Sequence, residues 1–202
     1  KGVARYTSDF TIPTSEASSS DPYFSSTKLL LNGNGTNGST TFTDSSNSSH
    51  TVTANGDAQI STTQSKFSGA SMYFDGSGDY LSIADNADFE LGSSDFTLEA
   101  WIYLTGYSAN YNNVYSAMIL CKDAADTGRS WSFGIGGTSS SWTSLSVTTF
   151  QSTSPVVLTG VSGSFNFALN TWYYVAAVKN NGTARLYVNG NDIGGGTIGA
   201  AA

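Results

Sequence analysis

Two aspartates separated by three small residues, in the stretch Asp75-Gly-Ser-Gly-Asp79, are the part of this sequence that comes closest to a metal-binding loop. Closely spaced acids and glycines can surround Ca²⁺ with carboxylate and carbonyl oxygens, although the later Glu of an EF-hand loop is missing here. The same residues are typical of a β-turn whose aspartates accept hydrogen bonds from the backbone. We favour the turn, and Asp75 and Asp79 remain candidate calcium ligands.

The sequence contains few residues of the types that nucleophilic catalysis requires. The single histidine, His50, lies in a Ser-rich stretch, and we expect a solvated turn residue there rather than a triad member. The single cysteine, Cys121, has no second histidine with which to form a thiolate pair. We expect its thiol to pack in the core, and one cysteine cannot form an intrachain disulfide.

Aromatic and amide side chains gather in two expected loops, Gly106 to Tyr115 and Gly136 to Trp142. Aromatic faces stack on sugar rings and amides bind hydroxyl groups, but the same mixture is typical of protein-binding surfaces. A third interpretation is that these rings pack into the fold or against a neighbouring subunit. The candidate ligand-binding residues are Tyr107, Tyr111, Asn112, Arg129 and Trp142.

The overall composition excludes two classes of partner. Charged residues make up only 11% of the chain, and the net charge is −7. Nucleic-acid binding needs clustered Lys and Arg, so nucleic acid is a poor candidate partner. No apolar run of about 18 residues is present, so we expect no membrane insertion.

Short apolar and β-branched runs separated by Gly, Asn, Asp and Ser predict an all-β chain. Residues 171–179 (TWYYVAAVK) are apolar on both faces, which predicts a central strand, and residues 96–104 (FTLEAWIYL) also read as an interior strand. Asn180-Asn181-Gly182 predicts a tight hairpin turn. The other expected strands are 28–32, 40–44, 50–55, 58–62, 70–74, 79–83, 117–122, 131–136, 144–150 and 184–190.

Residues 67–104 (FSGASMYFDGSGDYLSIADNADFELGSSDFTLEAWIYL) and 169–196 (LNTWYYVAAVKNNGTARLYVNGNDIGGG) closely resemble the laminin G-like, concanavalin A-like lectin/glucanase superfamily. The resemblance extends from about residue 29 to the end. It implies an antiparallel β-sandwich jelly roll of the concanavalin A-like, laminin G type. The same run resembles the version of this domain found in bacteriophage tail and virion-surface proteins, which implies a virion-surface or extracellular location.

The resemblance also bears on catalysis and on calcium. Glucanases of this superfamily carry an E-x-D-x-E strand that supplies paired carboxylates, and this sequence has none. Glu99 stands alone, and we expect it to hydrogen-bond a neighbouring strand. Relatives hold calcium at one rim, for which the loop KDAADTGRSW offers only Asp123 and Asp126. We therefore expect no enzyme, with Ca²⁺ as the one candidate cofactor.

Domain organisation is read from the same resemblance. Residues 1–14 resemble the tail of a preceding repeat or form an N-terminal strand arm, and residues 15–27 are a Ser-rich linker. Residues 28–202 form the sandwich, without the last strands of the family. Such a chain belongs to a tandem-repeat array, or a homo-oligomer completes the missing edge by strand addition between copies.

Two functions remain open at this point. The first is a non-catalytic adhesion module on a virion or extracellular fibre that binds host-surface glycan through loop aromatics. The second is a structural decoration or filament-forming module that contacts neighbouring copies of itself, completed by strand exchange.

Overall fold

The computed structural model describes residues 12–107, 116–124, 128–151 and 157–201. Regular structure in these ranges consists of β-strands and two short 3-10 helices, with no α-helix. None of these elements is a helix long and apolar enough to cross a membrane. The all-β prediction is confirmed.

The chain divides into two compact units. The first contains residues 13–89, and the second contains residues 90–202 together with Ile12. The Ser-rich stretch 15–27, expected to be a linker, lies in the first unit. The expected sandwich, 28–202, is shared between the two units.

The first unit contains four short strands and both 3-10 helices, namely η1 (Phe24–Ser26), β1 (Val52–Asn55), β2 (Gln59–Ser61), β3 (Ser71–Tyr73), β4 (Tyr80–Ile83) and η2 (Ala87–Phe89). β1 pairs with β4 and β2 pairs with β3, both antiparallel. The core of the unit is built from Phe42, Ile60 and Ala70. This core is small, and the side chains of Asp44 and Asp79 add hydrogen bonds to the backbone of the same unit.

Two segments expected to be strands, 28–32 and 40–44, form only isolated bridges. Leu31 bridges to Asp44, and Thr43 bridges to Thr51. The reason lies in the Asp44 carboxylate, which accepts the Leu30 N–H at 2.9 Å. A side chain thus takes a backbone donor that a continuous ladder would have used.

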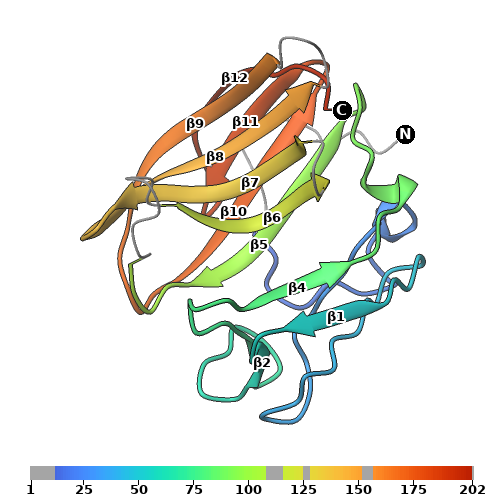
Figure 1. Cartoon of the computed structure of the whole chain (residues 1–202), viewed down its shortest axis with the longest axis vertical. Helices are drawn as coiled ribbons and strands as arrows, with labels where there is room; N and C mark the ends of the chain where they lie inside the picture. Colours follow the sequence, from blue (N-terminus) through green and yellow to red (C-terminus); the bar gives the residue numbers. More distant parts are fainter. Residues whose placement is uncertain (1–11, 108–115, 125–127, 152–156, 202) are drawn as a thin grey trace. The chain divides into compact units, whose positions relative to one another are not determined.

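The second unit contains eight described strands: β5 (Phe96–Tyr103), β6 (Ser116–Ala124), β7 (Gly128–Thr138), β8 (Ser141–Gln151), β9 (Val157–Phe167), β10 (Trp172–Asn180), β11 (Thr183–Val188) and β12 (Asn191–Thr197). They form two antiparallel sheets, β12-β11-β10-β5 and β6-β7-β8-β9. Figure 1 shows the sheets as two layers. The core between them includes Phe133, Leu145 and Val147 from one sheet and Val175 and Leu186 from the other, all fully buried.

The β10–β11 hairpin forms as predicted. Asn181 and Gly182 have φ angles of 48° and 77°, which is the left-handed backbone that Asn and Gly tolerate. β10 lies between β5 and β11, and its residues from Tyr173 to Lys179 are buried. The prediction of a central strand is confirmed.

The prediction that β5 is an interior strand is wrong, because among the described strands β5 lies at the end of its sheet. Thr97 and Glu99 are exposed, whereas the alternate residues Phe96 and Leu98 are half-buried and pack on the core. Such alternation is typical of a strand with one wet face.

The expected loop from Gly136 to Trp142 is also wrong. β7 continues to Thr138 and β8 begins at Ser141, so a tight hairpin joins the two strands. Glycine at position 137 lets the strands approach closely, since a Cβ there would lie 2.9 Å from the Trp142 Cα. Strand pairing therefore replaces the open loop.

Candidate functional site

The turn from Asp75 to Asp79 is held by its own carboxylates. Asp79 accepts the Asp57 N–H at 2.8 Å through Oδ1 and the Asp75 N–H at 2.9 Å through Oδ2. Asp75 Oδ1 accepts the Ser77 N–H at 2.6 Å. These are the side-chain to backbone hydrogen bonds that the turn interpretation predicts. They fix the loop that joins β3 to β4.

Asp57 joins the two predicted aspartates, and the ligand oxygens of the three carboxyl groups lie within 4.8 Å of one another. The hydrogen bond with Asp79 and the negative charges of Asp79 and Asp75 raise the pKa of Asp57. The Asp75 and Asp57 backbone N–H groups lower the pKa of Asp79. A shared cation would relieve this repulsion, but both Asp79 oxygens already accept N–H groups. Calcium at this turn stays a prediction.

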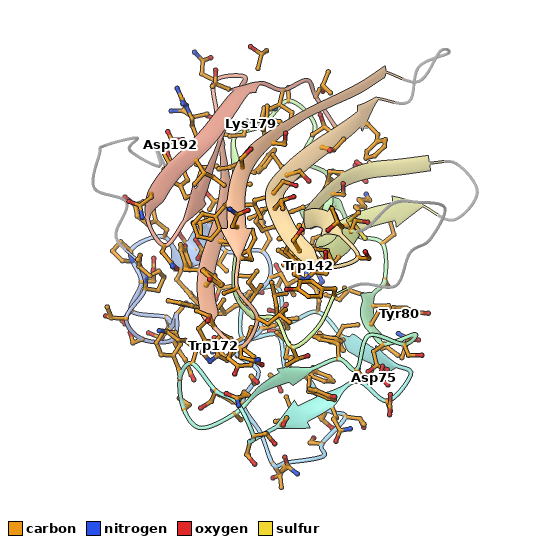
Figure 2. The ribbon with its side chains drawn as sticks, turned by 90° about the vertical axis from the view of Figure 1, so that its left-hand side faces the viewer. Asp75, Tyr80, Trp142, Trp172, Lys179 and Asp192 are labelled. Atoms are coloured by element: carbon orange, nitrogen blue, oxygen red, sulfur yellow. The ribbon has the colours of Figure 1, made fainter. Side chains whose placement is uncertain are left out.

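Three exposed aromatic residues lie next to the acidic turn along the chain. Tyr73 is 43% exposed, Phe74 is 41% exposed and Tyr80 is 56% exposed. The hydrogen bond between the Asp75 N–H and Asp79 closes the turn, so Phe74 and Tyr80 lie at its two ends. Figure 2 shows Asp75 and Tyr80 on the same side of the unit. We call Tyr73, Phe74, Asp75, Asp79 and Tyr80 the aromatic rim.

Sequence reasoning missed the aromatic part of this rim and Asp57. Tyr73, Phe74 and Tyr80 fall inside runs that alternate like strands, and such rings usually pack in a core. Asp57 follows β1 in a separate turn, so no motif links it to Asp75. Adjacent aromatics on both sides of a Gly-rich acidic turn are the signal that was available.

Of the predicted ligand-binding residues, Trp142 requires a correction. Its side chain is only 2% exposed and belongs to the core between the two sheets. Its Nε1–H donates to the Gly106 carbonyl at 2.9 Å. An indole inside the fold cannot stack on a ligand, so Trp142 positions the segment that carries Tyr107. Tyr107 is 40% exposed, and its ring centroid lies 6.3 Å from that of Trp142.

The other predicted site residues are only partly described. Tyr111, Asn112 and Asp126 lie outside the described residues. Arg129 in β7 pairs with Asp123 in β6, but their side chains are not among those described. Ligand binding at these positions stays a prediction.

Glu99 has the structural role expected of it. The Tyr174 hydroxyl donates to Glu99 Oε2 at 2.6 Å, which joins β10 to β5. Burial raises the pKa of Tyr174, and the neighbouring charge of Glu99 raises it further. The phenol therefore stays a hydrogen-bond donor, and Glu99 is anchored to the adjacent strand.

The expectation of a solvated His50 is wrong. Its side chain is only 10% exposed, and its Nε2 lies 3.3 Å from Asp88 Oδ2. Asp88 also accepts the Ser48 hydroxyl at 2.6 Å and pairs with Lys28 at 2.9 Å. Because Ser48 donates to Asp88 and not to His50, these three side chains do not form a catalytic triad.

Cys121 is exposed on β6, which overturns the expectation of a core-packed thiol. Its strand partner Ser132 lies on β7. Phe133, the next residue, points into the core, so Ser132 and Cys121 belong to the opposite face of the sheet.

Asp44 and Asp88 make the first unit sensitive to acid. Burial alone would raise the pKa of Asp44, but hydrogen bonds from the Leu30, Ser46 and His50 N–H groups outweigh it, and the pKa is lowered. The hydrogen bond from Ser48, together with Lys28, lowers the pKa of Asp88. Both carboxyl groups thus bind protons less readily in the folded chain than in the unfolded chain.

We expect the first unit to lose stability as pH falls below about 4. A carboxyl group with a lowered folded-state pKa contributes stability above its ordinary pKa of 3.8, and this contribution disappears as the group is protonated. Urea unfolding at pH 7, 5, 4 and 3 measures the loss. Asp88→Asn should reduce the dependence of the unfolding free energy on pH. A urea midpoint of the wild-type chain that does not change with pH would contradict this account.

The chain was compared with protein-family models, with curated protein sequences and with solved structures. A laminin G-type family model, described as the concanavalin A-like lectin/glucanases superfamily, matches residues 75–202. A solved structure of an S-layer domain-containing protein (residues 221–444) from Clostridium thermocellum ATCC 27405 is similar at a TM-score of 0.42 and 16% identity. That likeness covers 86% of this chain and 74% of the other. No curated protein sequence matches.

Proposed function

The chain belongs to the concanavalin A-like lectin/glucanase superfamily, and on this premise we propose that it is a non-catalytic module that binds carbohydrate outside the cell. The observation that carries the proposal is the aromatic rim, where three exposed aromatic residues adjoin a turn that carries two carboxylates. Aromatic faces bury the C–H faces of sugar rings, and Asp75 Oδ2, the oxygen that does not hold the Ser77 N–H, can accept a strong hydrogen bond from a hydroxyl group. The turn is held by its own hydrogen bonds, so it needs little ordering when a ligand binds.

The hydrogen bonds of Asp75, Asp79 and Glu99 support a binding role rather than a catalytic one. Asp75 and Asp79 use their oxygens to hold the backbone of the turn. Glu99 accepts the Tyr174 hydroxyl. A glycosidase needs one carboxyl group to donate a proton and a second to act as nucleophile or base. Groups engaged in structural hydrogen bonds are poorly suited to both tasks.

The proposed location rests on the sequence resemblance. The chain resembles domains of bacteriophage tail and virion-surface proteins, which supports a place on a virion or an extracellular fibre. A glycan-binding module in that place would attach the particle to a host-surface glycan. Tyr107, which is exposed on the second unit, would add a second contact area, and Tyr111, Asn112 and Arg129 stay predicted ligand-binding residues.

We expect Tyr80→Ala to weaken glycan binding about ten-fold or more, because truncating an aromatic anchor typically costs at least 1.4 kcal/mol. A glycan array identifies a ligand, and titration calorimetry then measures its dissociation constant. Tyr23→Ala is the matched control, since Tyr23 is also in the first unit and is 59% exposed. Equal affinities for the two variants would show that the aromatic rim is not the binding surface.

A structural module is the second candidate, and the position of β5 favours it. Within the described residues β5 ends its sheet, and such an edge can accept a strand from another copy. Light scattering over a range of protein concentrations separates the two functions. Polymers that persist on dilution, together with no binding on the array, would favour the structural role.

A further inference from the structure

A small pocket lies in the first unit beside its core. Its volume is about 110 Å³. This is several times the space that one water molecule needs, so the pocket can hold a small chemical group. It is lined by Leu31, Asn32, Gly33, Asn34, Phe42, Thr43, Ser45, Ile60 and Met72.

The lining has an apolar part and a polar part. Phe42 and Met72 belong to the core of the unit, and Leu31 adds a third apolar side chain. Asn32 and Thr43 supply an amide and a hydroxyl group. Among the described residues, neither side chain hydrogen-bonds another, so both are available to a ligand.

The walls of the pocket are fixed from several directions. Gly33 has a φ of 69°, and a Cβ there would lie 3.1 Å from the Met72 nitrogen, so the backbone runs directly over Met72. The Asn34 side-chain N–H donates to Glu16 Oε2 at 2.8 Å. Asp44 holds the Leu30 N–H at the other end of the same wall. A pocket with walls fixed in this way loses little entropy on binding.

We propose that this pocket binds the acetamido group of an N-acetylated amino sugar, an inference that rests on the proposed glycan-binding function and specifies its ligand. An acetamido group has four heavy atoms, with an apolar methyl at one end and a hydrogen-bonding amide at the other. The methyl group packs against Phe42, Met72 and Leu31. The amide exchanges hydrogen bonds with Asn32 and Thr43, and the sugar ring remains outside.

The pocket then makes the module selective. Glucose, which has a hydroxyl group at the same ring position, leaves the apolar wall empty. Glucosamine carries an ammonium group, and removing this charge from water to a place beside apolar side chains is strongly unfavourable. We therefore expect the pocket to bind glucose and glucosamine more weakly than N-acetylglucosamine.

The test is a titration of the ¹⁵N-labelled chain, followed by NMR, with N-acetylglucosamine, glucose and glucosamine. N-acetylglucosamine should shift the amide signals of residues 31–34 and 42–45, and the other two sugars should not. Asn32→Ala should raise the dissociation constant about ten-fold, because it removes one hydrogen bond to the ligand. Asn47→Ala, an exposed asparagine outside the pocket, is the matched control.

Two results would overturn the proposal. One is that glucose shifts the pocket signals as strongly as N-acetylglucosamine, or that neither sugar shifts them. The other is that Nε-acetyl-lysine binds there more tightly than the sugar, which would assign the pocket to an acetylated peptide. Signals of Tyr73 and Tyr80 report the aromatic rim separately, so a silent pocket with a responding rim leaves the proposed function intact.

Discussion

Asp44→Ala is expected to lower the free energy of unfolding of the first unit by about 3 to 5 kcal/mol. The Asp44 side chain accepts N–H groups from Leu30, Ser46 and His50 at 2.8 to 2.9 Å. It also accepts the Ser46 hydroxyl at 3.0 Å. A hydrogen bond to a charged group contributes about 1.5 to 3 kcal/mol, and each buried donor left without a partner adds a penalty.

Asp44→Ala should lower the stability of the whole first unit and should also loosen the backbone at the residues that the carboxylate binds. Urea unfolding gives the change in stability, and amide hydrogen exchange at Leu30, Ser46 and His50 should accelerate in the variant. Asp21→Ala is the control, because Asp21 accepts a single N–H, from Tyr23, at an exposed position. A loss at Asp44 no greater than the loss at Asp21 would contradict the role of this carboxylate as the organiser of the unit.

Trp142→Ala is expected to destabilise the second unit by about 3 to 5 kcal/mol. Removing a large aromatic side chain from a core leaves a cavity that neighbouring side chains fill only in part. The side chain is 2% exposed, and its loss also leaves the Gly106 carbonyl without the indole donor. Thermal unfolding monitored by near-UV circular dichroism measures the change.

Tyr107→Ala is the matched control for this prediction. Tyr107 contacts Trp142 from outside the core and is 40% exposed, so its removal should cost less than about 1 kcal/mol. A stable Trp142→Ala chain that had lost glycan binding would instead support Trp142 as a ligand-binding residue.

The sequence was most informative where chemical patterns were strong and local. β10 carries apolar residues on both faces and turns through Asn181-Gly182, so its central place and its hairpin were both predictable. β9, Val157–Phe167, was missed because it contains two glycines and two serines, which read as turn residues. It forms because it pairs along its length with β8, the strand before it in the chain, and this pairing overrides the low strand propensity of its glycines and serines.

The candidate site was less predictable, because it depends on which side of the fold each ring faces. Trp142 and Tyr80 both sit in aromatic, Ser-rich or Gly-rich surroundings, yet one is in the core and the other is exposed. His50 shows the same limit, since its partner Asp88 lies far along the chain. Burial of a single side chain is a tertiary property that local composition does not encode.

The measurement that tests the central claim most directly follows both binding and the fate of the ligand. The chain is incubated with each glycan that it captures on an array, and the glycan is then recovered and its reducing ends are counted. We predict that the glycan is bound and recovered intact, with binding weakened in Tyr80→Ala. New reducing ends that depend on the protein, or no capture of any glycan, would contradict the claim that the chain is a non-catalytic carbohydrate-binding module.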